Sequence, residues 1–554
     1  MGDRLRYVFR HRPIPDNELA ERAAELAERA ADKGRFWDAH MALMTRSDTL
    51  TAGDLQVVAQ ELGLDDVDPE SERRAREHVR ADTRSAAESD VQVTPTFFIN
   101  GRMYDGAWDD ESFVGALFGS LGHRMRTAAL DFARWAPSSG LLLLLATIVA
   151  VAISNSSSSA GFLAFWETTF GFRFGGSTFD LSLLHWVNDG LLTIFFLVVG
   201  LEIKREFTIG HLATRRSAAF PVVAAIGGLI VPVLLYRLVL PSGPWAHGWG
   251  VPMSTDTAFA IALIVMMGAR VPVELRIFLT AAAIVDDIGA IIVVALFYSG
   301  DLHWASLGAA GVITAGLWLL NRIGVYRVAP YLLLGIALWI CVHHGGLHAT
   351  LAGVVLALFI PTRNPPNLRS LMAQADAVFM AEARRSGDAL RTGPSLPALQ
   401  AFDAIHDRLE SPADRMLRLV SLRSNYVVLP LFALANAGVP LNASVMHGHG
   451  PLMGAIALGL VIGKPVGMVV FCALAMKLGW AEKPSSYSWA QLSGAGALAG
   501  IGFTMSLFIA GEAFQDPAAF AAAKIAIFSA SIFAALVGVF VLWRAGKPRA
   551  DSAT

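Results

Sequence analysis

Cysteine is almost absent from this chain of 554 residues. Its only two cysteines, Cys341 and Cys472, both lie inside apolar segments. A disulfide framework, a CxxC redox pair and a cysteine-rich zinc site are therefore excluded. Residues 1–30 are charged and contain no apolar core, so we expect no cleavable signal peptide.

Charge is also scarce. Charged residues make up 16% of the chain and hydrophobic residues 54%, whereas about a quarter of a typical soluble domain is charged. This composition predicts a protein that lies mostly in a membrane, with lipid as its main surroundings. The net charge of −2 gives no reason to expect a nucleic-acid partner.

The composition changes sharply near residue 137. Before it, "LRYVFR" has the pattern of a strand, and "DNELAERAAELAERAADKG" has apolar residues at helical spacing before a glycine. Later, "TPTFFINGR" and "WDDESFVGAL" predict a turn, a strand and a helix. We therefore expect a small α/β domain over residues 1–122 and a linker over 123–137. A membrane domain over 138–545 would follow, with a cytoplasmic loop at 362–417.

Apolar segments follow one another after residue 137, and we predict an all-α polytopic membrane domain of about twelve transmembrane helices. Several segments are shorter than the roughly 20 residues that a straight span needs. The segments are 138–155, 182–203, 218–240, 252–267, 277–298, 304–320, 329–343, 346–361, 424–440, 452–475, 490–511 and 522–543.

Lysine and arginine are distributed unevenly between the two sides of this predicted bundle. If the N-terminus is cytoplasmic, the outer segments hold little beyond Arg173, Arg237 and Lys524. The inner segments hold many more, including those in the loop after residue 361. The positive-inside rule then predicts that both termini are cytoplasmic.

Ionisable residues nevertheless occur inside the apolar segments: Asp189, Asp256, Asp286, Asp287 and Lys464. Each costs at least ~2.5–3.5 kcal/mol on insertion scales, and such residues usually lie on an ion or proton path. Paired charges that help helices associate are the alternative. Two adjacent acids and one lysine do not cancel, however, and adjacent helical residues point about 100° apart. At least one acid should face a water-filled cavity.

Two of the segments have the composition of interrupted helices. "PMSTDTAF" places proline, serine, threonine and aspartate inside an apolar run, and "SGAGALAGIGFTMS" is rich in glycine. Breaks are tolerated at membrane depth only inside protein or beside a cavity. The segments before them, "GGLIVPV" and "GLVIGKPVG", also correspond, which predicts inverted repeats of three helices.

Seven motifs in this order resemble the NhaA-type sodium/proton antiporters. They are "VNDGLLTIFFLVVGLEIKRE", "STDTAFAIA", "AIVDDIGAIIVVALFY", "GGLHATLAGV", "LPLFALANAGV", "LVIGKPVG" and "GIGFTMSLFIA". The resemblance covers residues 138–545. It implies exchange of Na⁺ or Li⁺ for H⁺ across a bacterial inner membrane, in the service of pH and sodium homeostasis. If both Asp286 and Asp287 release protons when sodium binds, the exchange would be electrogenic. It also implies no cofactor, no enzymatic activity and a possible homodimer.

The resemblance also implies roles for individual residues. Asp287 matches the principal cation-binding carboxylate and Asp286 its partner acid, with Thr255 as a polar ligand and Na⁺ held by these three. Asp256 and Lys464 match charges at the crossing of the broken helices. Asp256 is also expected to be part of the cation- and proton-binding site. Asp189 matches an accessory acid nearby. Residues linked to the pH response would be Glu202, Arg205, Glu206 and His348.

The N-terminal region resembles the later part of a DsbA-type thioredoxin fold, over roughly residues 3–120. "VTPTFFINGR" matches the segment in which that family has a cis-proline, here Pro95. The family's first strand and CxxC helix would precede "RYVFRHRPI". We therefore expect a structural or regulatory appendage, with a misassigned start codon as the alternative.

The paired carboxylates suggest a mechanism. A desolvated acid beside a like charge can hold either Na⁺ or H⁺ near the operating pH, and this competition would drive exchange. Lys464 would pair with Asp286 when Na⁺ is absent. Two other classes of protein are alternatives: a membrane thiol-redox protein, which the cysteine count opposes, and a cation channel, which the paired acids and the broken helices oppose.

Overall fold

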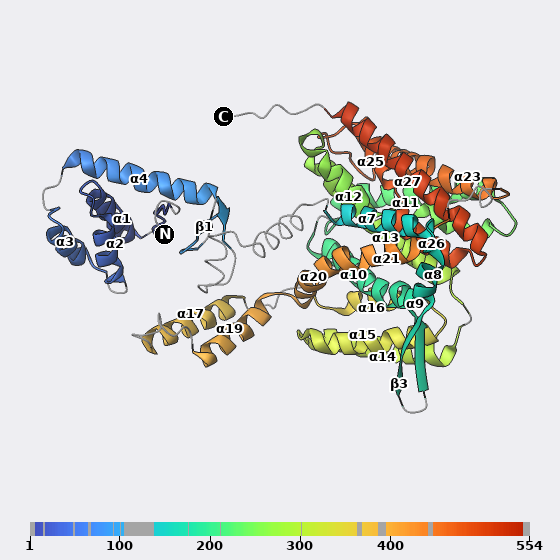
Figure 1. Cartoon of the computed structure of the whole chain (residues 1–554), viewed down its shortest axis with the longest axis horizontal. Helices are drawn as coiled ribbons and strands as arrows, with labels where there is room; N and C mark the ends of the chain where they lie inside the picture. Colours follow the sequence, from blue (N-terminus) through green and yellow to red (C-terminus); the bar gives the residue numbers. More distant parts are fainter. Residues whose placement is uncertain are drawn as a thin grey trace. The chain divides into compact units, whose positions relative to one another are not determined.

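The computed structural model describes residues 6–14, 17–47, 50–64, 68–91, 93–99, 101–104, 138–174, 177–210, 212–300, 302–362, 368–385, 395–440 and 447–546. The chain divides into two compact units, residues 1–130 and 131–554 (Figure 1). Each unit has its own hydrophobic core, and each is described by itself.

The described part of the first unit contains four helices and one short hairpin. Asn17 caps the first helix by accepting two backbone N–H groups, and the apolar stripe of this helix packs Leu26, Ala27 and Ala30 into the core. The peptide bond before Pro95 is cis, as the resemblance implied. The elements are α1 (Glu18–Ala31), α2 (Phe36–Met44), α3 (Ala52–Glu61), α4 (Pro69–Glu88), β1 (Phe98–Ile99) and β2 (Arg102–Met103).

One strand predicted in this unit is not formed. Residues 6–9 of "LRYVFR" have no strand structure in the part of the chain that is described. A strand needs a neighbour for its backbone hydrogen bonds, and the only strand pairing described in this unit joins β1 to β2. The backbone N–H of His11 is instead bound by the Asp82 carboxylate on α4, at 3.0 Å. The helix predicted from "WDDESFVGAL" lies outside the described residues.

The second unit, in the residues that are described, is a helical bundle with one β-hairpin. Its first elements are α7 (Ser138–Ser154), α8 (Ser159–Glu167), β3 (Thr169–Phe174), β4 (Ser177–Ser182), α9 (Leu183–His185), η3 (Trp186–Leu191), α10 (Leu192–Thr208), α11 (Arg215–Val239), η4 (Ala246–Met253), α12 (Thr257–Met266), η5 (Gly268–Arg270) and α13 (Val273–Phe297). The remainder are α14 (Trp304–Ile323), α15 (Val328–His344), α16 (Leu351–Phe359), α17 (Leu368–Arg385), α19 (Leu396–Leu409), α20 (Pro412–Arg423), η6 (Ser424–Val428), α21 (Leu429–Asn436), α23 (Gly450–Leu458), η7 (Gly459–Gly463), α24 (Lys464–Lys477), α25 (Trp489–Ala499), α26 (Phe503–Ala513) and α27 (Pro517–Ala545).

All twelve predicted apolar segments contain helix. Among the described residues, eight helices are long and apolar enough to cross a membrane, or up to ten if each of two bent pairs is one span. The bent pairs are α7 with α8, at 115°, and α25 with α26, at 45°. The helix α15 is apolar but shorter, and α16 has nine residues.

The two interruptions predicted from the sequence are confirmed. In the first, the 3₁₀ helix η4 ends at Met253, and α12 begins at Thr257 with Asp256 as its N-cap. In the second, α25 ends at Ala499 and α26 begins at Phe503. Turn-favouring side chains in the first segment and glycines in the second explain why neither runs as a continuous helix.

The predicted cytoplasmic loop is helical over much of its described part. It contains α17 and α19, whose Phe379 and Phe402 rings lie 4.5 Å apart. The helix that we predicted to begin at residue 424 begins at Pro412, because Ser411 caps it by accepting the backbone N–H of Asp414.

Helices α11 and α24 pack with their backbones in close approach. A Cβ added at Gly467 would lie 2.1 Å from the carbonyl oxygen of Gly227, and one at Gly227 would lie 2.3 Å from that of Gly467. Only glycine on both helices allows the two backbones to approach this closely. This contact joins the helices that precede the two broken segments, which is the pairing expected if the two halves of the bundle correspond.

Candidate functional site

The two carboxylates of α13 are buried where α13 meets α24 and α12. Asp286 is 3% exposed, Asp287 is 4% exposed and Lys464 is 1% exposed. The Lys464 ammonium, at the start of α24, donates a hydrogen bond to Asp286 Oδ2 and forms an ion pair with it. The Thr257 hydroxyl donates to Asp287 Oδ2 at 3.1 Å. One lysine therefore offsets one of the two acids.

Each of these carboxylates keeps one oxygen free of hydrogen bonds. Asp286 Oδ1 and Asp287 Oδ1 are both buried and have no partner among the described residues. An unsatisfied carboxylate oxygen in a buried position is costly, and a hard cation or a proton would remove that cost. The arrangement can therefore bind a small cation or a proton at Asp287.

The crossing of the two interruptions is held by Asp256. Its backbone N–H donates to Ile501 O at 2.5 Å. Its carboxylate accepts the backbone N–H of Phe259 at 3.1 Å, and the N–H and hydroxyl of Thr504 at 3.0 and 2.6 Å. Because these donors belong to the first turns of α12 and α26, the Asp256 charge lies at two helix N-termini, where a negative charge is stabilised. Both of its oxygens are occupied.

Thr255 lies in the same crossing. Its hydroxyl donates to Ala499 O at 2.7 Å, which fixes the hydrogen and leaves the oxygen lone pairs available. Nearby, the Ser506 hydroxyl donates to Val251 O at 2.8 Å. The sequence identified Thr255 but not Thr257, although both lie in the "STDT" segment and Thr257 is the residue that bonds to Asp287.

The other predicted residues lie elsewhere. Asp189 belongs to the π-helical segment η3, and its carboxylate is 3.8 Å from Nδ1 of His343. His348 lies between α15 and α16 and faces Glu512 on α26, at 3.7 Å. Neither His343 nor Glu512 was predicted, because they come from the ends of other helices.

The residues at the far end of α10 form a separate group. Arg205 lies 3.6 Å from Asp414 at the start of α20. The Lys204 ammonium donates to the carbonyl oxygens of Leu358, at 2.8 Å, and Ile360. Glu202 and Glu206 lie on the same helix. The structure therefore separates His348 from the three pH-linked residues with which the resemblance grouped it.

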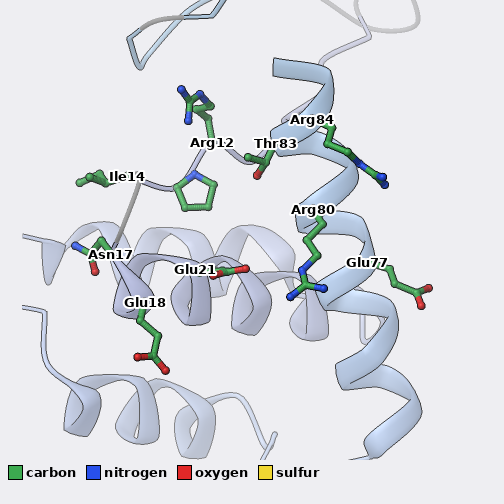
Figure 2. A pocket seen from close by; sticks show the side chains of 10 residues that line it. Arg12, Ile14, Asn17, Glu18, Glu21, Glu77, Arg80, Thr83 and Arg84 are labelled. Atoms are coloured by element: carbon green, nitrogen blue, oxygen red, sulfur yellow. The ribbon is translucent and has the colours of Figure 1, made fainter. Parts of the chain in front are cut away.

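The first unit holds a hollow of about 990 Å³ that contains both charge signs (Figure 2). Arg80 and Glu77 extend from α4, and Glu18 and Glu21 belong to α1, on the other side of the hollow (Figure 2). Its three arginines and three glutamates balance, so that no single class of ligand is favoured. The full lining is Arg12, Pro13, Ile14, Asn17, Glu18, Glu21, Glu77, Arg80, Thr83 and Arg84.

A carboxylate in the same unit joins two histidines. Glu28 accepts from His11 Nε2 at 2.9 Å and from His78 Nδ1 at 2.6 Å. Burial raises the pKa of Glu28, but these two hydrogen bonds outweigh burial and hold it below its ordinary value. The hydrogen bond to Glu28 raises the pKa of His78.

A bundle of apolar helices with two interrupted helices that cross beside buried carboxylates defines an ion-coupled membrane transporter. The chain belongs to the Na+/H+ antiporter 1 family, whose family model matches residues 130–542. A thioredoxin family model matches residues 2–117. Both resemblances inferred from the sequence are confirmed.

Several relatives that match most of this chain share the name Na(+)/H(+) antiporter NhaA. The Na(+)/H(+) antiporter NhaA of Nitrosospira multiformis is 60% identical over 98% of this chain and 90% of its own length. The Na(+)/H(+) antiporter NhaA of Helicobacter pylori strain P12 is 41% identical, over 74% of this chain and 93% of its own length. That of Wolinella succinogenes is 39% identical, over 76% and 93%. A solved structure, the sodium proton antiporter MjNhaP1 from Methanocaldococcus jannaschii, has a TM-score of 0.37 at 13% identity and covers 78% of this chain and 97% of its own.

Proposed function

We propose that the chain is a secondary active antiporter that exports Na⁺, or Li⁺, from a bacterial cell in exchange for H⁺. The observation that carries the proposal is the pair of buried carboxylates on α13, of which only Asp286 is offset by a lysine and each keeps an unbonded oxygen. The names of the relatives support the same activity.

Exchange follows from competition at Asp287. A proton on this carboxylate and a sodium ion beside it both satisfy the free oxygen, but not at the same time. Sodium would be held by Asp287, Asp286 and the oxygen of Thr255, and its positive charge would weaken the pair between Lys464 and Asp286. Protons released to one side and sodium released to the other would complete the cycle.

Charge movement follows from the same arrangement. If sodium binding releases protons from Asp287 and from either Asp286 or Lys464, more proton charge than sodium charge moves in each cycle. Each excess charge is worth about 2.3 kcal/mol per 100 mV of membrane potential. Clamping proteoliposomes with K⁺ and valinomycin at equal pH should therefore drive ²²Na⁺ outward when the interior is negative. A sodium flux that ignores the potential would show that exchange is electroneutral.

The remaining residues have supporting roles in this proposal. Asp256 and Lys464 fix the charges around the crossing, and Asp189 acts as an accessory acid. Glu202, Arg205, Glu206 and His348 carry the response to pH. Both termini and the loop at 362–417 lie in the cytoplasm, and the protein resides in the inner membrane. Two copies would form a homodimer, with the β3–β4 hairpin contributing to the contact.

The chain has three regions in this proposal. Residues 1–122 form the thioredoxin-like appendage, 123–137 a linker and 138–545 the antiporter. The first unit has its own core. Neither cysteine of the chain lies in this unit, so we assign no thiol redox activity to it. A chain that starts near Arg124 and inserts normally should keep sodium transport.

One experiment tests the function directly. Everted membrane vesicles that contain this protein should collapse a pH gradient when Na⁺ is added, over a range of pH. Asp287→Asn should abolish the response while the protein remains folded and inserted, because the amide removes the charge without changing volume. Glu274→Gln, an exposed acid at the start of α13, is the matched control and should retain activity. Full exchange by Asp287→Asn would remove Asp287 from the mechanism.

A further inference from the structure

Ionisable side chains from four elements gather at the end of the membrane unit where α13 and α26 finish. Asp189 on η3 faces His343 on α15, and His348 before α16 faces Glu512 on α26. None of the interactions described for these four side chains reaches Asp286 or Asp287. The residues of this second cluster and those of the cation site are therefore distinct.

The hydrogen bonding of His348 fixes its tautomer. His348 Nε2 lies 2.7 Å from the backbone carbonyl oxygen of Tyr298, which can only accept, so Nε2 must carry a hydrogen. Neutral imidazole has one N–H group, and Nδ1 is then a lone pair. This nitrogen lies 3.7 Å from Glu512 Oε2. A lone pair that faces an ionised carboxylate is repelled by it, and one proton on either group turns this repulsion into attraction.

We propose that His348 and Glu512 together form a proton-binding site separate from the two carboxylates of α13, and that Glu512 determines the pH at which this site fills. This proton site rests on the proposed function in one respect: one of the two measurements that test it is sodium-driven exchange. His348 supplies the nitrogen, and Glu512 supplies the negative charge that retains the proton.

The carboxylate in direct contact with His348 is that of Glu512. Asp189 lies within electrostatic range of both Glu512 and His348, but its own ion-pair contact is with His343, at 3.8 Å. His185 also lies within electrostatic range of Glu512, and its ring bonds to the Ser182 hydroxyl at 2.7 Å. From α13, the Tyr298 hydroxyl donates to His247 O at 2.8 Å. On α26, the uncharged Phe508 ring also faces His348, with the ring centres 6.3 Å apart.

The pair is connected to the cation site through whole helices. Glu512 lies eight residues, or about 12 Å, along α26 from Thr504, which bonds to Asp256 at the crossing. The carbonyl that binds His348 belongs to Tyr298, at the end of the helix that carries Asp286 and Asp287. A proton shared by His348 and Glu512 therefore ties the ends of α13 and α26 together.

The test compares pH profiles of the full chain. Rates of sodium-driven proton flux are measured in proteoliposomes that start at equal pH on both sides. Glu512→Gln should move one limb of the profile to lower pH by about one unit, because a charge partner within 4–6 Å shifts proton binding by at least that much. His348→Gln, which keeps a donor for Tyr298 O, should remove that limb, and adding Glu512→Gln to it should change nothing further. Glu274→Gln should have the wild-type profile.

A second measurement does not depend on transport. Difference titration of detergent-solubilised wild type against His348→Gln should show that the variant takes up about one proton fewer across that limb. A Glu512→Gln profile that matches wild type, or equal proton uptake by wild type and His348→Gln, would overturn the inference. Absence of sodium-driven flux in the wild type would instead overturn the proposed function, and the difference titration would still decide the proton site.

Discussion

Replacing Lys464 with methionine should strongly destabilise the protein, because it leaves the Asp286 carboxylate buried without its counter-charge. Lys464 is 1% exposed and Asp286 is 3% exposed, and the second oxygen of Asp286 already lacks a partner. Breaking a buried pair from one side costs about 3–5 kcal/mol. Methionine is unbranched and only one atom shorter than lysine, so it still fills the space beside Gly228 that the lysine Cδ occupies, and the loss of packing should be small.

The assay is thermal unfolding of the purified full chain in detergent at alkaline and acidic pH. The loss of stability in Lys464→Met should be largest at alkaline pH. It should be smaller at acidic pH, where the unpaired Asp286 carboxylate takes up a proton. Asp286→Asn combined with Lys464→Met removes both charges and should recover most of the stability. Lys477→Met, at the exposed end of the same helix, is the matched control. Wild-type stability of Lys464→Met at alkaline pH, or a double variant no better than the single one, would refute the reasoning.

Three further predictions follow from particular contacts. Thr257→Val removes the hydroxyl that bonds to Asp287 and should raise the sodium concentration for half-maximal exchange about tenfold, since such a bond is worth about 1.5 kcal/mol; an unchanged value would exclude this contact. Gly467→Ala should prevent α11 and α24 from packing and reduce the amount of folded protein, whereas Gly454→Ala, with open space around it, should not; equal yields would contradict the packing. In the first unit, Glu28→Gln should speed amide hydrogen exchange in α1 and α4 mainly between about pH 4.5 and 6.5. The lowered pKa of Glu28 stabilises the folded unit above about pH 4.5, and the raised pKa of His78 stabilises it below about pH 6.5, so both contributions are present in this window. An effect that does not depend on pH would show that charge is not the cause.

Much of the membrane unit could be predicted because its signals are local. Apolar runs located the helices, and the "PMSTDTAF" and glycine-rich segments located the two interruptions. The exchange mechanism proposed after the resemblance suggested the pairing of Lys464 with Asp286, which lies 178 positions earlier in the chain. Few other cations occur at membrane depth, so the number of possible partners was small.

The parts that could not be predicted depend on where helix ends meet. The Glu512 side chain reaches His348 only because α26 and the turn before α16 finish at the same end of the bundle. The early start of α20 was missed for a different reason. Its charged residues resemble a loop, although Ser411 and Pro412 are typical of a helix beginning.

The membrane unit contains two large hydrophobic cores rather than one. One core runs through α11, α13, α24, α25 and α27, and the other joins α14, α15, α16 and α20. Helix α10 contributes to both, but the Lys204 ammonium and the close approach of Gly200 to Ala357 attach it to α16. Among the described residues, a small cluster of Val199, Ile203 and Ile284 lies at the boundary between α10 and α13. Ile284 is two residues from Asp286. A movement of one core relative to the other would therefore take place along a boundary that passes next to the candidate ion site.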